Sequence, residues 1–419
     1  MKGVWASVFS GRMGACIVLG FSSGMPLYVL ITLLSAFLRK EGVDLKIIGL
    51  FSLLMIPYTW KFLWAPVLDR YSLGRLGRRR GWIIATQLLL MLSIAALGLF
   101  SPKDHLHAVG ALALFTAFAS ATQDIAIDAY RREVLPDNEL GLGNSLFVNA
   151  YRISGLVPGG LSLIIAQWLS WDLVFAATAL CLLPGFLITL SLKERGCAAA
   201  PRTLKQAVTE PWREFIRRRG GAHALLVLAF VFLYKLGDSM ATALSTPFYI
   251  DLGYDLMTIG IIAKNVGLWS MVAGGLLGGI LMLRLGINKA LWIFGGGQMV
   301  TILAFALLAH AGQGGTPSLW LFSFAVGAEA LGAGLGTAAF VSYIASVTNP
   351  GYTATQFALL TSLSAVPRTF CNAVTGYIAD YCGWENFFFI CFALAVPGML
   401  LLFKVAPWRT RKAPASGGL

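Results

Sequence analysis

Charged residues are scarce in this sequence. Asp, Glu, Lys and Arg make up 12% of its 419 residues, about half of the roughly 25% that a soluble domain carries. Apolar residues make up 57%, and the mean hydropathy is +0.75. Because the apolar residues form long runs and not short alternating segments, the sequence predicts an all-α membrane protein and excludes large extramembrane domains and a β-barrel.

Motifs of metal, nucleotide and disulfide chemistry are also lacking. None of the six cysteines lies in a CxxC pair, and the four histidines form no HExxH pattern. No Walker A sequence is present, so we do not expect this chain alone to use ATP. Residues 20–24 fit the GxSxG pattern of a serine nucleophile, but they lie in an apolar span with no preceding strand. We therefore expect no metal, no cofactor and no enzymatic activity.

Acidic residues are outnumbered, with 19 Asp and Glu against 32 Lys and Arg, which gives a net charge of +13. The basic residues concentrate in three short polar segments, at 70–80, 193–219 and 404–412. By the positive-inside rule these segments are cytoplasmic, which predicts an even number of spans with both termini inside. The first outside connection departs from the rule, since it carries Arg39, Lys40 and Lys46. The positive charge thus indicates orientation, and no nucleic-acid partner is expected.

Apolar runs bounded by charged residues or by Gly and Pro predict twelve membrane-spanning helices in two sets of six. The first set covers 13–38, 46–68, 82–100, 108–129, 143–168 and 173–192, and the second covers 223–250, 256–283, 289–311, 317–346, 354–380 and 386–406. The domains that we predict are an N-terminal half at 1–192, a cytoplasmic linker at 193–222, a C-terminal half at 223–406 and a cytoplasmic tail at 407–419. Apolar residues recur among the bases of the linker, which predicts an amphipathic helix on the inner leaflet.

Glycine and proline patterns inside the spans predict close packing and kinks. There are five GxxxG spacings, among them Gly20 with Gly24, and such spacings let two helices approach closely. Prolines inside spans, such as Pro57 and Pro158, predict kinks.

The connection between the second and third spans carries a motif. Ala65 is followed four residues later by Asp69, then by Arg70, a glycine and a basic cluster that includes Arg78. The corresponding connection of the second half keeps the small residue, the Arg, the Gly and the Lys in register, but has Leu283 in place of the acid. The repeated motif and the two sets of six spans resemble the major facilitator superfamily. The alternative is a generic positive-inside loop.

An Asp at the inner end of a helix can latch two elements together. It accepts hydrogen bonds from arginine and from the N-terminal amides of a neighbouring helix. Breaking such a latch shifts a transporter between inward and outward opening. We predict that Asp69 is the latch acid and that Arg70 and Arg78 are its partners.

Ionisable residues inside the predicted spans are candidates for function, because an unpaired charge at bilayer depth is costly. Five basic and four acidic residues qualify: Lys61, Asp124, Asp128, Arg152, Lys235, Asp238, Lys264, Glu329 and Arg368. The slight positive excess favours an anionic or zwitterionic solute over a cation.

The fourth span carries two acids one turn apart on one face, Asp124 and Asp128. Asp128 lies within reach of Arg131 and Arg132, which predicts a structural ion pair. Asp124 is one turn deeper and has no base nearby unless Arg152 reaches it. We expect Asp124 to bind and release the coupled proton, with Asp128 beside it in the proton-coupling site.

Two alternatives stay open for the charges of the second half. Lys235 and Asp238 are three residues apart, so they can neutralise each other or bind a ligand. Lys264, Glu329 and Arg368 lack partners at suitable spacing on their own helices, so they form cross-helix pairs or ligand contacts.

Five segments together resemble the AmpG muropeptide permeases of Gram-negative bacteria. They are GFSSGMPL at 20–27, WKFLWAPVLDRY at 60–71, QDIAIDAY at 123–130, YKLGD at 234–238 with TPFY at 246–249, and YTATQ at 352–356. QDIAIDAY is the most specific of them, and eukaryotic acetyl-CoA transporters carry a related version. The resemblance covers most of the chain. Longer members carry extra helices for which this chain has no room, so its preference for peptide length stays open.

The resemblance implies proton-driven import of GlcNAc-1,6-anhydro-MurNAc peptides across the bacterial inner membrane. These products feed peptidoglycan recycling and, in some species, signal β-lactamase induction. The expected partners are the anhydro-muropeptide, protons and the lipid bilayer, and the chain is expected to be monomeric. The substrate-binding residues that we predict are Gln123, Lys61, Arg152, Tyr234, Lys235, Asp238, Lys264, Glu329 and Arg368.

Two other functions remain open. The nearer is a facilitator of another anionic solute, such as an acyl-CoA or a siderophore. The farther is a membrane enzyme that acts on wall fragments. Uptake competition tests the first, and product analysis by mass spectrometry tests the second.

Overall fold

The computed structural model describes residues 10–43, 51–73, 77–192, 194, 203–371 and 374–408, and every regular element in these ranges is a helix. The chain divides into two compact units. Unit 1 comprises Met1–Phe215 and Ile344–Ser362, and unit 2 comprises Ile216–Tyr343 and Leu363–Leu419. The segment 344–362 therefore packs with unit 1, although it lies far along the chain.

Unit 1 is all helical in its described part because a helix satisfies its backbone hydrogen bonds within one segment, as a bilayer requires. Its elements are α2 (Gly11–Tyr28), η1 (Val29–Leu33), α3 (Leu34–Lys40), η2 (Phe51–Met55), α5 (Ile56–Trp60), η3 (Lys61–Leu63), α6 (Ala65–Arg70), α7 (Arg78–Leu97), α8 (Pro102–Val134), α9 (Leu140–Ser154), η4 (Val157–Leu161), α10 (Ser162–Ile165), α11 (Trp171–Leu180), α12 (Leu183–Ser191), most of α13 (Leu204–Arg219), η6 (Pro350–Tyr352) and the start of α20 (Thr353–Phe370).

Two of the predicted spans are interrupted helices. The described part of 46–68 consists of η2, α5, η3 and the start of α6, and Pro57 and Pro66 each stand in the first turn of a new segment, where a missing N–H is tolerated. The span predicted at 143–168 consists of α9, the π-helical turn η4 with Pro158, and α10. The kinks predicted at Pro57 and Pro158 fall at these breaks between helical segments.

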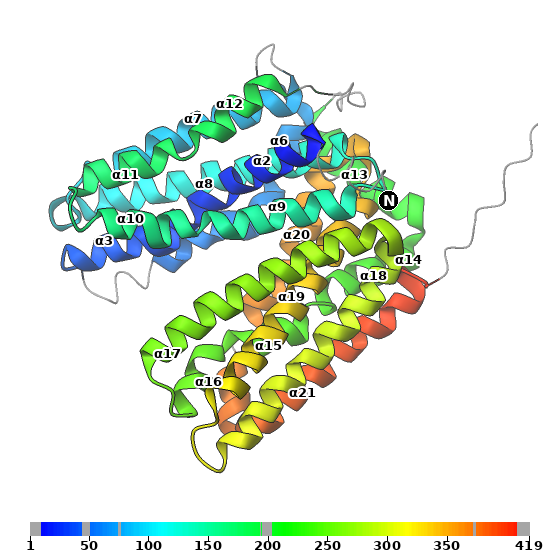
Figure 1. Cartoon of the computed structure of the whole chain (residues 1–419). Coiled ribbons are helices and arrows are strands. Elements are labelled where there is room, and N and C mark those ends of the chain that lie inside the picture. The colour runs from blue at the N-terminus through cyan, green and yellow to red at the C-terminus, as the bar shows by residue number, and fades with distance from the viewer. Residues whose placement is uncertain are drawn as a thin grey trace, which may run out of the picture. The chain divides into compact units, whose positions relative to one another are not determined.

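Close helix packing organises unit 1. A Cβ atom on Gly20 would overlap the carbonyl oxygen of Phe147, and one on Gly24 would overlap that of Tyr151. The approach predicted from this GxxxG pair is therefore confirmed, and α2 and α9 run side by side (Figure 1). On another side of the unit, α7 packs against α8, α11 and α12.

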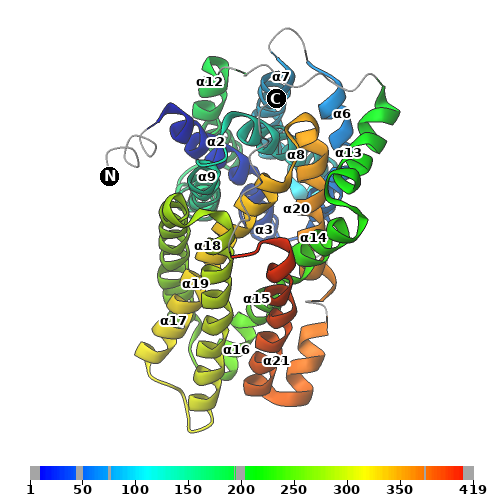
Figure 2. The ribbon, with the colours of Figure 1, turned by 90° about the vertical axis from the view of Figure 1, so that its right-hand side faces the viewer.

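Unit 2 holds the remaining helices around an aromatic core. They are α14 (Gly221–Leu233), α15 (Leu236–Ala243), α16 (Ser245–Asp251), α17 (Leu256–Ile261), η5 (Ile262–Gly267), α18 (Leu268–Gly312), most of α19 (Leu319–Val347), the end of α20 and α21 (Thr375–Val405). Two arms of α18 meet at Gly286, with φ +74°, a backbone conformation that glycine adopts readily. Helices α18 and α21 pack side by side (Figure 2).

Eight helices in the described part are long and apolar enough to cross a membrane. They begin with Gly11–Lys40, which joins α2, η1 and α3, and end with Thr375–Val405. The interrupted segments 51–70 and 140–165 are not among the eight. The fold is thus an all-α membrane protein, and the count of twelve stays a prediction.

Candidate functional site

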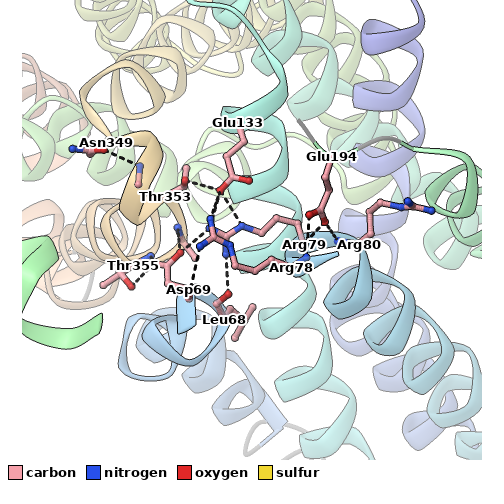
Figure 3. Close-up of polar contacts among 12 residues, drawn as sticks. Leu68, Asp69, Arg78, Arg79, Arg80, Glu133, Glu194, Asn349, Thr353 and Thr355 are labelled. Atoms are coloured by element: carbon pink, nitrogen blue, oxygen red, sulfur yellow. Dashed lines mark hydrogen bonds and ion pairs between the residues drawn. The ribbon is translucent and has the colours of Figure 1, made fainter. Parts of the chain in front are cut away.

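Asp69 lies near the end of α6 with its side chain fully buried. Its Oδ1 accepts hydrogen bonds from Arg79 Nη2 at 2.7 Å and from the backbone N–H of Ala354 at 3.3 Å. Its Oδ2 accepts from the backbone N–H and the hydroxyl of Thr355, at 2.8 and 2.6 Å (Figure 3). Ala354 and Thr355 belong to the first turn of α20, so the carboxylate also meets the positive end of a helix dipole.

Arg79 connects Asp69 to the end of α8. Its Nε and Nη2 donate to Glu133 Oε1 at 3.0 and 2.8 Å, and its Nη1 donates to the carbonyl oxygen of Leu68 at 3.0 Å (Figure 3). The same Glu133 oxygen accepts a hydrogen bond from the Thr353 hydroxyl at 2.8 Å. One planar guanidinium thus bridges two carboxylates. We call this cluster the Asp69 network: Asp69, Arg79, Glu133, Thr353 and Thr355.

Glu194 caps the start of α7. Its carboxylate accepts the backbone N–H groups of Arg78, Arg79 and Arg80, at 3.0, 2.7 and 2.6 Å. First-turn amides have no partner inside their own helix, and a carboxylate there is stabilised by the helix dipole. Gly77 precedes these amides with φ +103°, and a Cβ atom there would lie 2.6 Å from Glu194 Cδ. This turn therefore requires glycine.

The prediction that Arg70 and Arg78 bind the Asp69 carboxylate is wrong, because Arg79 occupies that place. Arg78 Nη1 donates to the backbone carbonyl of Asp69 at 3.2 Å, and its Nη2 lies 3.7 Å from Glu133 Oε1. Arg70 lies over the ring of Tyr71, with its Cζ 5.2 Å from the ring centroid. Successive residues of a helix point about 100° apart, and in α7 it is Arg79 that faces the carboxylate.

The α20 end of the Asp69 network is itself held by α13. Gln356 Nε2 donates to Glu214 at 2.7 Å and to the carbonyl oxygen of Pro211 at 2.9 Å. Its Oε1 accepts the backbone N–H of Asn349 at 2.8 Å, and Asn349 Nδ2 donates to Glu214 at 2.7 Å. Every polar atom of the Gln356 amide group is thus engaged.

A second bond ties η6 to α13. The Tyr352 hydroxyl donates to Glu210 at 2.6 Å. This hydrogen bond, together with partial desolvation, raises the pKa of Tyr352 to about 12. We call the contacts between the two segments the linker clamp: Glu210, Pro211, Glu214, Asn349, Tyr352 and Gln356.

Asp124 lies in the second half of α8 and is buried. Its Oδ1 accepts a hydrogen bond from the hydroxyl of Ser23 on α2, at 2.5 Å. The charged side chains that act on it are Lys61, Asp128 and Arg131. The expectation that only Arg152 could act on Asp124 is therefore wrong, since Lys61 and Arg131 do so.

Asp128 lies one turn further along α8 and forms two ion pairs. Lys61 Nζ is 3.7 Å from its Oδ2, and Arg131 Nη2 is 2.9 Å from its Oδ1. The Arg131 guanidinium also lies over the ring of Phe147, 3.8 Å from the centroid. Arg132 pairs instead with Asp137 at 3.1 Å. We call the following group the α8 cluster: Ser23, Lys61, Gln123, Asp124, Asp128 and Arg131.

Gln123 differs from its neighbours on α8. It is fully buried, yet neither its amide oxygen nor its amide nitrogen has a hydrogen-bond partner among the described residues. Such a group is rare in a protein interior and calls for an explanation, such as a bound ligand or water. Arg152 lies in the last turn of α9.

In unit 2, Lys235 Nζ lies 2.9 Å from Asp238 Oδ2. The two residues stand at the break between α14 and α15. Asp238 lines a small hollow together with Tyr234 and with Gln298 of α18. Of the two alternatives left open for these residues, the structure shows the pairing of Lys235 with Asp238, and ligand binding stays a prediction. Glu329 is buried on α19.

Tyr234 serves the packing of unit 2. Its hydroxyl donates to the carbonyl oxygen of Leu291 at 3.0 Å, and its ring stacks on Phe340 with centroids 5.4 Å apart. The side chains of Lys264 and Arg368 lie outside the described residues. Among the described residues no group of three His, Cys, Asp or Glu side chains could hold a metal ion.

Several residues of these sites were not predicted from the sequence. Arg79 and Glu133 belong to the Asp69 network. Glu194 caps the start of α7, and the Ser23 hydroxyl donates a hydrogen bond to Asp124. Ser23 and the YTATQ segment lie within family segments quoted above, so that signal was available. Glu194 is 116 residues from the first amide it caps, and no local pattern indicates such a pairing.

Comparison with known proteins places the chain in a family. The Major Facilitator Superfamily model matches residues 16–368. The anhydromuropeptide permease of Escherichia coli K12 is 42% identical over 93% of this chain and 79% of its own length. The putative transporter AmpG 4 of Rickettsia conorii is 32% identical over 93% of this chain and 95% of its own length.

The fold agrees with this placement. The crystal structure of FucP, a major facilitator superfamily transporter in the outward conformation, superposes with a TM-score of 0.70 at 12% identity, covering 94% of this chain and 99% of that chain. A likeness at this identity concerns the fold alone. With the family model and the two relatives, it leads to one conclusion: the chain is a multi-pass membrane transporter that belongs to the major facilitator superfamily and, within it, to the AmpG-like muropeptide permeases.

Proposed function

We propose that this protein imports anhydro-muropeptides across the bacterial inner membrane by proton symport and alternating access. The observation that carries the substrate is the 42% identity to the Escherichia coli anhydromuropeptide permease over nearly the whole chain. The proposal includes two halves of six spans, joined by the linker that contains α13, with both termini in the cytoplasm. It treats the protein as a monomer without a cofactor.

The α8 cluster is the proposed proton site. With both acids ionised, Lys61 and Arg131 balance Asp124 and Asp128, so the cluster is formally neutral. A proton on Asp124 gives it one net positive charge. Because a buried positive charge attracts an anion strongly in a medium of low dielectric constant, protonation and binding of the substrate carboxylate favour each other. This linkage is the proposed basis of symport.

Basic side chains of the predicted binding set take part by exchanging partners. Lys61 and Lys235 are paired with Asp128 and Asp238, and a substrate carboxylate replaces those acids when it binds. Gln123 supplies both a donor and an acceptor, which suits a sugar hydroxyl or a peptide amide. We include Arg152, Glu329, Lys264 and Arg368 in the path by their place in the predicted spans. For Tyr234 we propose ring contacts, since its hydroxyl is engaged.

The Asp69 network is the proposed latch on the cytoplasmic side. It holds the ends of α6, α7 and α8 to the start of α20, and its opening accompanies the change between inward and outward states. Arg79 is the arginine of this latch, and Arg78 supports it through backbone and Glu133 contacts.

Uptake of labelled anhydro-muropeptide into proteoliposomes under an imposed pH gradient tests the proposal. We expect accumulation that needs the gradient and is blocked by unlabelled anhydro-muropeptide. Gradient-dependent uptake of a labelled acyl-CoA or siderophore, with no uptake of labelled anhydro-muropeptide, would assign the alternative solute class. Absence of gradient-dependent accumulation would defeat proton symport.

A further inference from the structure

The side of α13 opposite the linker clamp is exposed. Val208, Trp212 and Ile216 are spaced one turn apart along one stripe of the helix, with 45%, 40% and 46% of their surfaces exposed. Pro211 and Phe215 are buried, and together with Trp212 they line a hollow beside Leu359 and Leu360 of α20. Trp212 thus borders the docked side with one part of its ring and is exposed with the rest. The helix therefore has one docked side and one open apolar stripe, which we call the α13 stripe.

The acidic and the basic residues of α13 differ in their contacts and in their exposure. The helix carries five basic and two acidic residues. Both acids, Glu210 and Glu214, are bonded within the linker clamp. Lys205, Arg213 and Arg217 are exposed. The exposed charge of α13 is thus positive. By helical spacing Lys205 lies in the sector of the apolar stripe, and Arg213 and Arg217 lie on one side of it.

The chain places one end of α13 next to the membrane. Arg219 is followed by Gly220, with φ +78°, and then by the spanning segment Gly221–Asp251. One connecting residue reaches only about 3.5 Å, so the C-terminal end of α13 lies at the level where that span begins. An apolar stripe accompanied by Lys and Arg at this level is typical of an interfacial helix, whose apolar side enters the headgroup region while its bases meet phosphates. A lipid surface therefore fits better than a soluble protein partner.

We propose that the α13 stripe and its bases bind anionic phospholipid headgroups, and that this contact stabilises the Asp69 network through the linker clamp. The connection is short. Gln356 and Tyr352 bond α13, and Thr355, one residue before Gln356, donates two hydrogen bonds to Asp69. Anionic lipid that holds α13 in place also holds the start of α20 against the latch acid. The consequence for gating rests on the latch function proposed above, whereas the lipid contact does not.

Lipid contact is tested on the purified full chain with phospholipids brominated in their acyl chains, which quench nearby tryptophan. The fluorescence of Trp212 is obtained by subtracting the fluorescence of the Trp212→Phe variant from that of the wild type. We expect brominated phosphatidylglycerol to quench it and brominated phosphatidylcholine to do so much less. In the triple variant Lys205→Gln, Arg213→Gln, Arg217→Gln, the affinity for phosphatidylglycerol, read from this quenching, should fall by about fivefold for each base removed.

Two controls accompany this variant. Arg39→Gln, Lys40→Gln, Lys103→Gln removes the same charge from exposed positions away from α13 and should bind lipid as the wild type does. Arg213→Lys with Arg217→Lys keeps the charge and should retain binding. Equal quenching by both lipids, or an unchanged triple variant, would overturn the lipid assignment.

Coupling to the latch is measured by amide hydrogen exchange in peptides that cover 349–356, with and without phosphatidylglycerol. We expect slower exchange with the lipid in the wild type and in the Arg39, Lys40, Lys103 control, and no change in the triple α13 variant. Lipid binding without any change in exchange would overturn the coupling. Because neither readout measures transport, a failure of the proposed transport function is recognised separately by the uptake assay.

Discussion

Asp69 and Asp124 are buried carboxylates in the same unit, and the protein satisfies them very differently. Asp69 accepts four hydrogen bonds, from a guanidinium, two backbone amides and a hydroxyl. Asp124 accepts one, from the hydroxyl of Ser23, and it stands beside Gln123, whose amide has no partner among the described residues. A saturated carboxylate holds elements in place. A carboxylate with unused hydrogen-bond acceptor sites can take a proton or a ligand. This difference distinguishes Asp69 in the proposed latch from Asp124 in the proposed transport path.

Loss of Arg79 should have the largest effect on stability. Arg79→Ala leaves Asp69 and Glu133 buried without their shared guanidinium, and removal of one partner of a buried ion pair typically costs about 3–5 kcal/mol. We expect a large fall in the thermal unfolding temperature of the purified protein. Arg70→Ala is the matched control, since Arg70 stacks on Tyr71 near the same turn. Equal stability of the two variants would contradict the central place of Arg79.

Replacement of Gln356 and of Gln123 by leucine should affect stability and uptake in opposite ways. Gln356→Leu breaks three hydrogen bonds and leaves Glu214 short of a donor, so it should destabilise by about 2–3 kcal/mol. Gln123→Leu removes an amide without protein partners among the described residues and should leave thermal stability unchanged or slightly raised. In uptake assays, Gln123→Leu should raise the apparent KM by about tenfold, the worth of one hydrogen bond. A destabilised Gln123→Leu protein with normal uptake would reverse the assignment.

A small effect is expected at Tyr352. Tyr352→Phe removes a half-buried hydrogen bond to Glu210 and should cost about 1 kcal/mol. Because this bond raises the pKa of Tyr352 from 10.0 to about 12, its contribution is complete below pH 10 and disappears as the pH rises towards 12. Thermal unfolding of both proteins across this range should show the difference closing. A difference that persists unchanged would indicate another cause.

Local patterns in the sequence were sufficient to predict the helical fold class and the close approach of α2 and α9 at Gly20 and Gly24. They also predicted that the Asp69 carboxylate accepts hydrogen bonds from the first-turn amides of a helix. They could not select Arg79 over Arg78, because the choice depends on how α7 is rotated against α6. They also could not show that 344–362 packs with unit 1 or that Glu194 caps α7. Those contacts join residues more than a hundred positions apart, and no periodicity within a span encodes them.

A transport assay of Asp124→Asn decides whether Asp124 carries the coupled proton. Asp124→Asn and the wild type are compared in proteoliposomes for exchange of labelled anhydro-muropeptide without a pH gradient and for accumulation with one. The asparagine keeps an acceptor for Ser23 but cannot exchange a proton. We predict that the variant retains exchange and loses gradient-driven accumulation. Accumulation by Asp124→Asn equal to that of the wild type would contradict the account.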